Sequence, residues 1–324
     1  MKVFVFLMGL FEGVMIELTN YCNLNCSFCP NQYMKREKVH MNLDLFKKIL
    51  NEIKEKELSD SITFHLMGEP TLHPEFKEIC EVLSKFNFKK TLVTNGCFLD
   101  EELSKKIIKA RIDQVIISTQ SFTDINLENI KSSCKLFKEN KVKIGFRFWL
   151  WDNIKAEESF IVKEKKESAF ILNLIKEIFP LDLQEKILNF KVPGEMKIDD
   201  YISFSFNRRF DWNIDFQNEV DCGFCYDPFV FLPILSNGDI VLCCYDYDGK
   251  TKMGNVNDSF ISDVLRSAKW KKTTKNLING KLDLGFCKKC RGRISPLERI
   301  KIRSKIKSKK VQDLISKHLS YQEL

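Results

Sequence analysis

The stretch that decides the fold is Thr19-Asn-Tyr-Cys22-Asn-Leu-Asn-Cys26-Ser-Phe-Cys29-Pro30, which follows an apolar run typical of a first strand. Three cysteines spaced CxxxCxxC suit a cubane iron–sulfur cluster, with one thiolate on each of three irons. The fourth iron is then open, and an open coordination position marks a catalytic rather than a structural metal centre. The stretch therefore predicts a catalytic iron–sulfur site at the carboxyl end of a strand, where barrels carry their chemistry.

Outward from this stretch, the first two thirds of the chain alternate short β-branched runs with longer amphipathic runs. Strands are predicted at Val14–Thr19, Ser61–Leu66, Lys90–Thr94, Asp113–Thr119, Lys143–Leu150 and Tyr201–Phe206. Helices are predicted at Leu43–Glu57, Glu75–Phe86, Asp100–Ala110, Asp124–Asn140 and Lys166–Phe179. Six strand–helix units predict an α/β fold with parallel strands. We expect a partial (β/α)6 TIM-like barrel, with a doubly wound sheet as the alternative.

The strand–helix period is lost around Phe206–Glu219, and a cysteine-rich region follows. We expect an N-terminal lead-in strand at 1–12, a core partial barrel at 13–210, a small Cys-rich α+β domain at 211–292 and a basic helical tail at 293–324. Within the last two segments, Ser236-Asn-Gly-Asp predicts a hairpin turn, Asp258–Thr274 one amphipathic helix, and Arg299–His318 a basic helix.

Composition narrows the class of protein. The 324 residues are 44% hydrophobic and 30% charged, which is typical of a globular chain. No apolar run reaches the roughly 18 residues of a membrane span, so no membrane partner is expected. Twelve cysteines without a secretion signal predict a reducing, cytoplasmic location, where clustered cysteines serve metals or catalysis.

The charge of the chain is unevenly placed. The net charge is +8, yet residues 291–324 hold ten Lys or Arg against three Asp or Glu. The body is therefore nearly neutral, and the excess describes a basic tail with a solvated helix face. A nucleic-acid partner is not expected, because no aromatic residues are interleaved with these charges.

Two further motifs accompany the cysteine stretch. Met67-Gly68-Glu69-Pro70 follows the second predicted strand, and Thr94-Asn95-Gly96 ends the third. With an aromatic residue, Phe28, before the last cysteine, the three motifs together resemble the radical S-adenosylmethionine (radical SAM) superfamily. Met67 departs from that family's GGEP motif, where a glycine stands first.

The resemblance implies that Cys22, Cys26 and Cys29 hold a [4Fe–4S] cluster that cleaves S-adenosylmethionine (SAM) reductively to a 5′-deoxyadenosyl radical, which abstracts hydrogen from a substrate. It also implies cofactor-binding roles, namely Phe28 near the adenine, Gly68 and Glu69 near the methionine ammonium, Asn95 at the end of the third strand, and Ser118, Gln120 and Arg147 toward the ribose and carboxylate. Arg208 and Arg209 are candidate catalytic residues for an anionic substrate or a proton transfer, with ordinary surface arginines as the alternative.

The C-terminal region holds six more cysteines, at 222, 225, 243, 244, 287 and 290. A cysteine, then Gly238-x₄-Cys243, then a CxxC pair resembles the short form of the SPASM or "twitch" auxiliary-cluster domain. The resemblance implies a second [4Fe–4S] cluster held by Cys225, Cys243, Cys287 and Cys290, with Cys222 or Cys244 as alternative ligands. A four-cysteine zinc site is the other interpretation of this region.

A closed second cluster suits electron transfer. The resemblance therefore implies a radical SAM oxidoreductase of the dehydrogenase type, acting on a small hydroxylated molecule such as a sugar or cyclitol. A flavodoxin or ferredoxin would supply its electrons. The alternatives are a peptide- or protein-modifying radical SAM maturase and, from another class, a non-catalytic zinc-binding scaffold.

Overall fold

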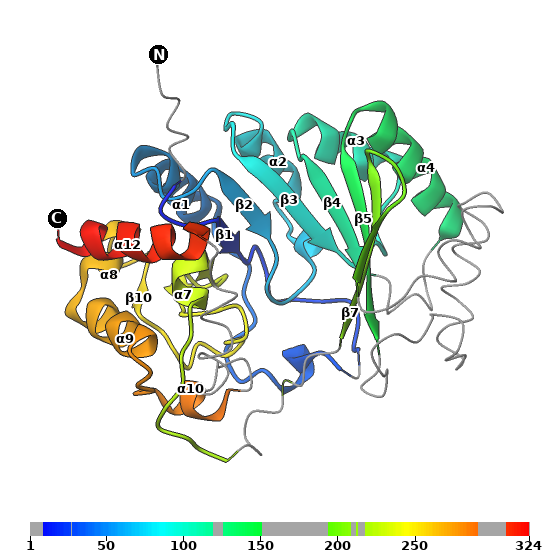
Figure 1. Cartoon of the computed structure of the whole chain (residues 1–324). Helices are drawn as coiled ribbons and strands as arrows, with labels where there is room; N and C mark the ends of the chain where they lie inside the picture. Colours follow the sequence, from blue (N-terminus) through cyan, green and yellow to red (C-terminus); the bar gives the residue numbers. More distant parts are fainter. Residues whose placement is uncertain are drawn as a thin grey trace. The chain divides into compact units, whose positions relative to one another are not determined.

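The computed structural model describes residues 9–26, 28–118, 126–150, 194–208, 212, 218–290 and 309–323 (Figure 1). The chain forms two compact units, each assembled from separate stretches of sequence. The first unit comprises Met1–Cys22, Phe28–Gly68 and Asp211–Leu324, and the second comprises Asn23–Ser27 and Glu69–Phe210. The first strand and the C-terminal region therefore belong to one folded body.

The sheet of the first unit is built around β1 (Gly13–Ile16). This strand pairs in parallel with β2 (Ser61–Phe64) on one side and with β8 (Phe231–Ile234) on the other. Two short strands, β9 (Asp239–Ile240) and β10 (Gly254–Asn255), extend the sheet beyond β8 by antiparallel pairing. The side chains of β1 are almost all buried, as expected for the central strand of a sheet covered on both faces.

The helices of the first unit follow from caps and apolar spacing. Helix α1 (Leu43–Glu55) begins at Asn42, whose side chain accepts hydrogen bonds from the backbone of Asp44 and Leu45. Its apolar residues recur every three to four positions and are buried. The other helical elements are η1 (Pro30–Tyr33), α7 (Asp227–Val230), α8 (Ile261–Arg266), α9 (Ala268–Ile278), α10 (Gly285–Lys289) and α12 (Lys309–Glu323).

The second unit contains a mostly parallel sheet. Its strands are, in spatial order, β3 (Lys89–Thr94), β4 (Gln114–Ser118), β5 (Lys143–Leu150), β7 (Ile202–Arg208) and an antiparallel edge strand, β6 (Gly194–Lys197). Figure 1 shows the helices α2 (Phe76–Leu83), α3 (Glu101–Lys109) and α4 (Leu127–Glu139) on one side of the strands. A short 3₁₀ helix, η2 (Pro70–Leu72), precedes α2. The carboxyl ends of parallel strands, and the side chains that follow them, gather at one edge of this sheet.

A ladder of buried phenylalanines fixes the register of β5 and β7. Phe146 lies opposite Phe204 with ring centroids 5.3 Å apart, and Phe148 lies opposite Phe206 at 5.0 Å. A slip of one residue would turn these rings to the other face of the sheet, so their burial specifies the pairing.

The predicted α/β class is confirmed, and the six predicted strands overlap β1 to β5 and β7. The hairpin turn predicted at Ser236 joins β8 to β9. The prediction of one helix over Asp258–Thr274 is wrong. Ser267 takes an extended conformation between α8 and α9 and caps α9 by accepting a hydrogen bond from the Trp270 N–H.

Some strand pairings and contacts in the structure were not predicted from the apolar pattern of the sequence. Neither the pairing of β8 with β1 nor the edge strand β6 was anticipated. The tail helix is α12, which packs on α7 and α8 and buries Leu314 and His318, so it is more than a solvated basic face. The predicted helix Lys166–Phe179 and tail residues 299–308 lie outside the described residues. None of the helices described here has both the length and the apolar stretch that a membrane crossing needs.

Candidate functional site

The first cysteine loop leaves β1 through two buried residues, Thr19 and Asn20. Thr19 Oγ1 donates a hydrogen bond to Val39 O at 3.3 Å. Asn20 Oδ1 accepts one from Val39 N at 2.7 Å, and its Nδ2 donates to Glu37 O at 2.8 Å. The residues before the first cysteine are thus tied to the segment that follows the last one.

The three cysteines of the loop are half-buried, and so is Phe28, the expected neighbour of the adenine. Cys22 and Cys29 belong to the first unit and Cys26 to the second. Across the described ranges, no three His, Cys, Asp or Glu side chains converge as a single metal ion would require. A cubane cluster binds each thiolate on a different iron, so its ligands are spread more widely than around one ion.

Gly68 lies directly against the start of the loop and has a φ of +77°. A Cβ at this position would stand 2.2 Å from Thr19 O and 2.8 Å from the Asn20 Cα, which is closer than any real contact. Only glycine fits both the conformation and the space. The GEP segment therefore places its backbone, without a side chain, against the start of the cysteine loop. This close backbone packing fits a loop that must leave room for a bound cofactor.

Glu69 is buried and its carboxylate accepts four hydrogen bonds within the second unit. The donors are Thr71 N at 3.2 Å, Thr71 Oγ1 and Thr94 Oγ1 at 2.7 Å each, and Asn95 N at 2.7 Å. Burial raises the pKa of Glu69, and these hydrogen bonds oppose the rise. Asn95 in turn donates to Asn23 Oδ1 at 2.9 Å. The Glu69 side chain therefore joins η2 to the end of β3.

Polar residues expected at later strand ends are placed as follows. Ser118 at the end of β4 lies in register with Arg147 on β5. Burial lowers the pKa of Arg147 below its ordinary value. Arg208 ends β7 opposite Leu150, and only its backbone is described. Gln120 and Arg209 lie outside the described residues.

The C-terminal cysteines are brought together within the first unit. Cys225 lies within electrostatic reach of Cys287 and Cys290, and Cys243 within reach of Cys225. Burial raises the pKa of the Cys225, Cys243 and Cys287 thiols, to about 12 for Cys287. The backbone N–H of Asp227 is hydrogen-bonded to the Cys225 thiol, and that of Tyr245 to the Cys243 thiol. Such N–H donors stabilise thiolates, so this donor set fits an iron–sulfur cluster.

The two alternative ligands differ in their surroundings. Cys222 is exposed, and its backbone forms an isolated bridge with Lys281. Cys244 is half-buried, and burial raises the pKa of its thiol to about 12. The carboxyl of Asp227 lies near both Cys244 and Cys243. Exposure thus separates Cys222 from the other five cysteines of this region.

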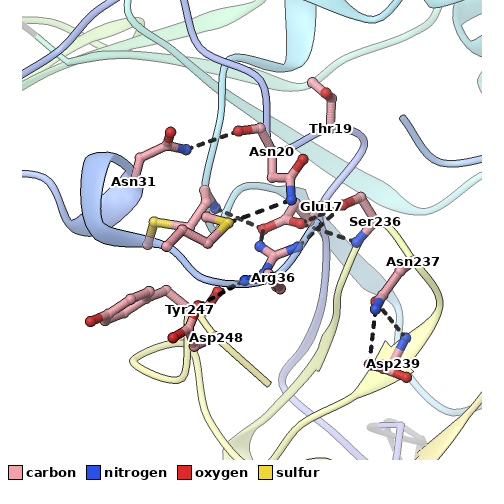
Figure 2. Close-up of polar contacts among 12 residues, drawn as sticks. Glu17, Thr19, Asn20, Asn31, Arg36, Ser236, Asn237, Asp239, Tyr247 and Asp248 are labelled. Atoms are coloured by element: carbon pink, nitrogen blue, oxygen red, sulfur yellow. Dashed lines mark hydrogen bonds and ion pairs between the residues drawn. The ribbon is translucent and has the colours of Figure 1, made fainter. Parts of the chain in front are cut away.

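One polar network of the first unit was not foreseen from the sequence (Figure 2). Glu17 on the chain leaving β1 is buried and forms an ion pair with Arg36 Nη2 at 2.5 Å. Its carboxylate also accepts from Ser236 Oγ at 2.7 Å, Ser236 N at 3.1 Å and Met67 N at 3.2 Å. Arg36 Nε donates to Tyr247 O at 2.6 Å. Four distant segments therefore meet at one buried carboxylate.

A signal for this network was present in the sequence. Glu17 interrupts the apolar run Val14-Met-Ile-Glu-Leu18, and a charged residue in a buried strand requires a partner. The pattern could not name the partner, because Ser236 lies 219 positions away.

Two family models match the chain. The model of the radical SAM superfamily matches residues 16–148, which include the cysteine loop and the GEP segment. The model of the SPASM iron–sulfur cluster-binding domain matches residues 225–291, which include Cys225, Cys243, Cys287 and Cys290.

Curated relatives fall into several functional groups. The S-adenosyl-L-methionine-dependent 2-deoxy-scyllo-inosamine dehydrogenase of Niallia circulans is 23% identical over 287 residues, which are 87% of this chain and 93% of that protein. The tungsten-containing aldehyde ferredoxin oxidoreductase cofactor-modifying protein of Pyrococcus furiosus is 35% identical over 103 residues. That match covers 32% of this chain and 29% of the relative, so the chain spans under a third of that protein.

Solved structures agree on the fold. BtrN in complex with AdoMet and 2-DOIA has a TM-score of 0.57 at 18% identity, covering 87% of this chain and 93% of that one. The anSMEcpe structure with bound AdoMet has a TM-score of 0.56 at 14% identity, covering 96% and 98%. The chain belongs to the radical SAM superfamily and carries a SPASM domain. Its cofactors are SAM, a [4Fe–4S] cluster and auxiliary iron–sulfur.

Proposed function

We propose that the chain is a radical SAM dehydrogenase that oxidises a small hydroxylated molecule, such as a sugar or cyclitol, using one auxiliary [4Fe–4S] cluster. The observation that carries this proposal is the match to the 2-deoxy-scyllo-inosamine dehydrogenase, which includes both domains and 93% of that protein. The grouping of the half-buried cysteines 225, 243, 287 and 290 supports a second cluster with four protein ligands.

When bound, the cofactors supply hydrogen-atom abstraction at the first site and an acceptor for one electron at the second. With these two cofactors, the hydrogen atom and the electron removed when a carbinol is oxidised each have an acceptor. The substrate loses a hydrogen atom, a proton and one electron, and its C–O single bond becomes a carbonyl. An external reductant such as a flavodoxin or ferredoxin provides the electron that starts each turnover, and a reducing, cytoplasmic setting keeps the thiols available.

The chain's own residues position these parts. Cys22, Cys26 and Cys29 hold the first cluster, and Gly68 keeps the GEP backbone against their loop. Glu69 holds η2 to the end of β3 through Thr94 and Asn95, so we assign it to bracing rather than to direct contact.

Charged strand-end residues have separate roles in the proposal. Arg147, within β5, and its neighbour Ser118, at the carboxyl end of β4, bind the SAM carboxylate and ribose. Arg208, at the end of β7, and Arg209 bind an anionic group of the substrate or act in its proton transfer.

The test uses the anaerobically reconstituted, reduced protein with SAM and a panel of cyclitols and aminosugars. We expect 5′-deoxyadenosine and a substrate product lighter by two hydrogens. A Cys287→Ser/Cys290→Ser variant should still form 5′-deoxyadenosine but lose the oxidised product, whereas Cys22→Ala should form neither. Formation of 5′-deoxyadenosine without any oxidised small molecule contradicts the proposal.

A peptide- or protein-modifying maturase is the second candidate. The anSMEcpe structure with AdoMet and the Cp18Cys peptide matches 87% of this chain and 88% of that one, so a peptide-bound relative shares the same extent. SuiB of Streptococcus suis, bound to its precursor peptide SuiA, matches over 73% of its own length. A mass change on a peptide library, with none on the small molecules, would favour this candidate.

The zinc-scaffold alternative is less well supported at the second site. The SPASM model that matches residues 225–291 is that of an iron–sulfur cluster-binding domain. Metal analysis separates the two, since eight irons without zinc indicate two [4Fe–4S] clusters, and zinc retained with four irons indicates a structural second site.

A further inference from the structure

Lys38 follows the last cysteine of the loop in sequence. Its ammonium contacts Asn20 and Asn31, the residues at the two ends of the loop, which we call the loop neck. Lys38 Nζ donates to Asn20 O at 2.9 Å and to Asn31 O at 3.5 Å, and it is also hydrogen-bonded to Asn31 Oδ1. Asn31 Nδ2 donates to the same Asn20 O at 2.9 Å (Figure 2). Asn20 precedes Cys22 and Asn31 follows Cys29, so one ammonium joins both ends of the cysteine loop.

The charge of Lys38 is not neutralised by a carboxylate. Its three acceptors are two carbonyl oxygens and one amide oxygen, and it forms no ion pair among the described residues. Glu17, a carboxylate that influences the pKa of Lys38, is paired with Arg36. The other anionic groups within its electrostatic reach are the thiols of Cys22 and Cys29.

Partial burial disfavours the positive charge of Lys38. Burial lowers the pKa of Lys38, and the neighbouring Arg36 lowers it further, while Cys22 and Cys29 raise it. A desolvated cation is stabilised when an anion is placed beside it. A cluster held by three thiolates is anionic, and it gains one more negative charge on reduction.

We propose that Lys38 is a positioning residue and counter-charge of the first cluster: it joins the ends of the cysteine loop and favours the reduced state of the cluster bound there. The proposal rests on the proposed radical SAM function, and it adds the residue that sets how easily this cluster accepts its electron. Because the charge is fixed at the loop neck, it acts before any substrate binds.

The expected effect is a change in the reduction equilibrium. Lys38→Gln removes the positive charge and should lower the ratio of reduced to oxidised cluster about tenfold at a fixed reductant potential, which for one electron equals a shift of about 59 mV toward more negative potential. Lys38→Arg retains the charge and should restore the wild-type potential.

The experiment is a redox titration of the reconstituted full chain followed by electron paramagnetic resonance. The first cluster is identified as the one whose signal changes when SAM is added, because only its open iron binds SAM. Lys35→Gln is the matched control. It removes the same charge from an exposed side chain of the same segment, where solvent and salt screen the field, and should leave the potential unchanged.

A second variant keeps the proposal testable if Lys38→Gln binds no first cluster. Asn31→Asp keeps the shape of the neck but pairs Lys38 with a carboxylate, so it should shift the potential in the same direction. The proposal is overturned if either variant retains the cluster at the wild-type potential. It is also overturned if both variants lose the cluster, since the lysine would then serve only to hold the loop.

Failure of the substrate proposal is distinguishable from failure here. The titration uses no substrate, so a chain that oxidises peptides instead of cyclitols would still show the Lys38 effect. Conversely, if Lys38→Gln keeps the wild-type potential, the Lys38 proposal fails, but the proposal about substrate oxidation is not affected.

Discussion

Arg36→Met tests whether the buried network around Glu17 stabilises the first unit. The substitution keeps a long apolar side chain but removes the guanidinium that pairs with Glu17 and contacts Tyr247 O. Glu17 then stays buried with only the Ser236 N–H, the Ser236 hydroxyl and the Met67 N–H as donors. The variant therefore converts a neutralised pair into an uncompensated buried carboxylate.

The magnitude follows from what remains around the carboxylate. Removing one partner of a buried ion pair costs roughly 3–5 kcal/mol of unfolding free energy. The three remaining donors place the expected loss at the lower end, about 3 kcal/mol. In a domain of 150–250 residues each kcal/mol lowers the melting temperature by about 2–4 °C, so we expect a decrease of roughly 6–12 °C.

The assay is thermal unfolding of the reconstituted protein under anaerobic conditions. Lys105→Met, which breaks an exposed ion pair with Glu101, is the control and should cost less than about 1 kcal/mol. The double variant Glu17→Met/Arg36→Met removes both charges and should recover much of the loss. If Arg36→Met melts no lower than Lys105→Met, the network does not stabilise the fold and this reasoning is refuted.

Three other variants test the site and the tail. Gly68→Ala should cost the chain about four irons in anaerobic iron analysis, because its Cβ would displace the cysteine loop, while Gly285→Ala, with nothing within 4 Å, should lose none. Cys225→Ala should likewise lose about four irons, whereas Cys222→Ala, at an exposed position, should keep both clusters; the reverse result would reassign the ligand. The pKa of His318 is lowered to about 4 by burial, so the unfolded chain takes up a proton below about pH 6.5 and stability is lost as the pH falls. Between pH 7 and pH 5 the wild type should lose about 2 kcal/mol more than His318→Phe in denaturant unfolding, and equal losses would show that this histidine is not buried neutral.

The strands and most helices could be predicted from the sequence because their signals are local. Apolar spacing in α1 and the cap residue Asn42 lie within one or two turns of each other, so a short window carries the information. The same window failed at Ser267, where a serine that caps α9 interrupts an otherwise helical apolar pattern. The break depends on the extended backbone conformation of Ser267, which the spacing of apolar residues does not encode.

The motifs of the candidate site were also readable, because cluster ligands and glycine turns lie at fixed short spacings. The CxxxCxxC loop, Gly68 and the closing CxxC pair needed only sequence order to suggest their chemistry. What each neighbouring side chain does was less accessible. Glu69 carries the motif, yet its carboxylate is fully engaged with Thr71, Thr94 and Asn95, which only the packed strand ends reveal.

The sequence alone thus determined the class of chemistry: three cysteines in one loop, six more in a second region, and predicted parallel strands for the core. Only the tertiary structure decided that β8 pairs with β1, that Glu17 meets Arg36 and Ser236, and that Lys38 joins both ends of the first loop. The reason is physical. Periodicity and ligand spacing are properties of neighbouring residues, whereas a buried charge finds its partner only when segments some 200 positions apart are packed together.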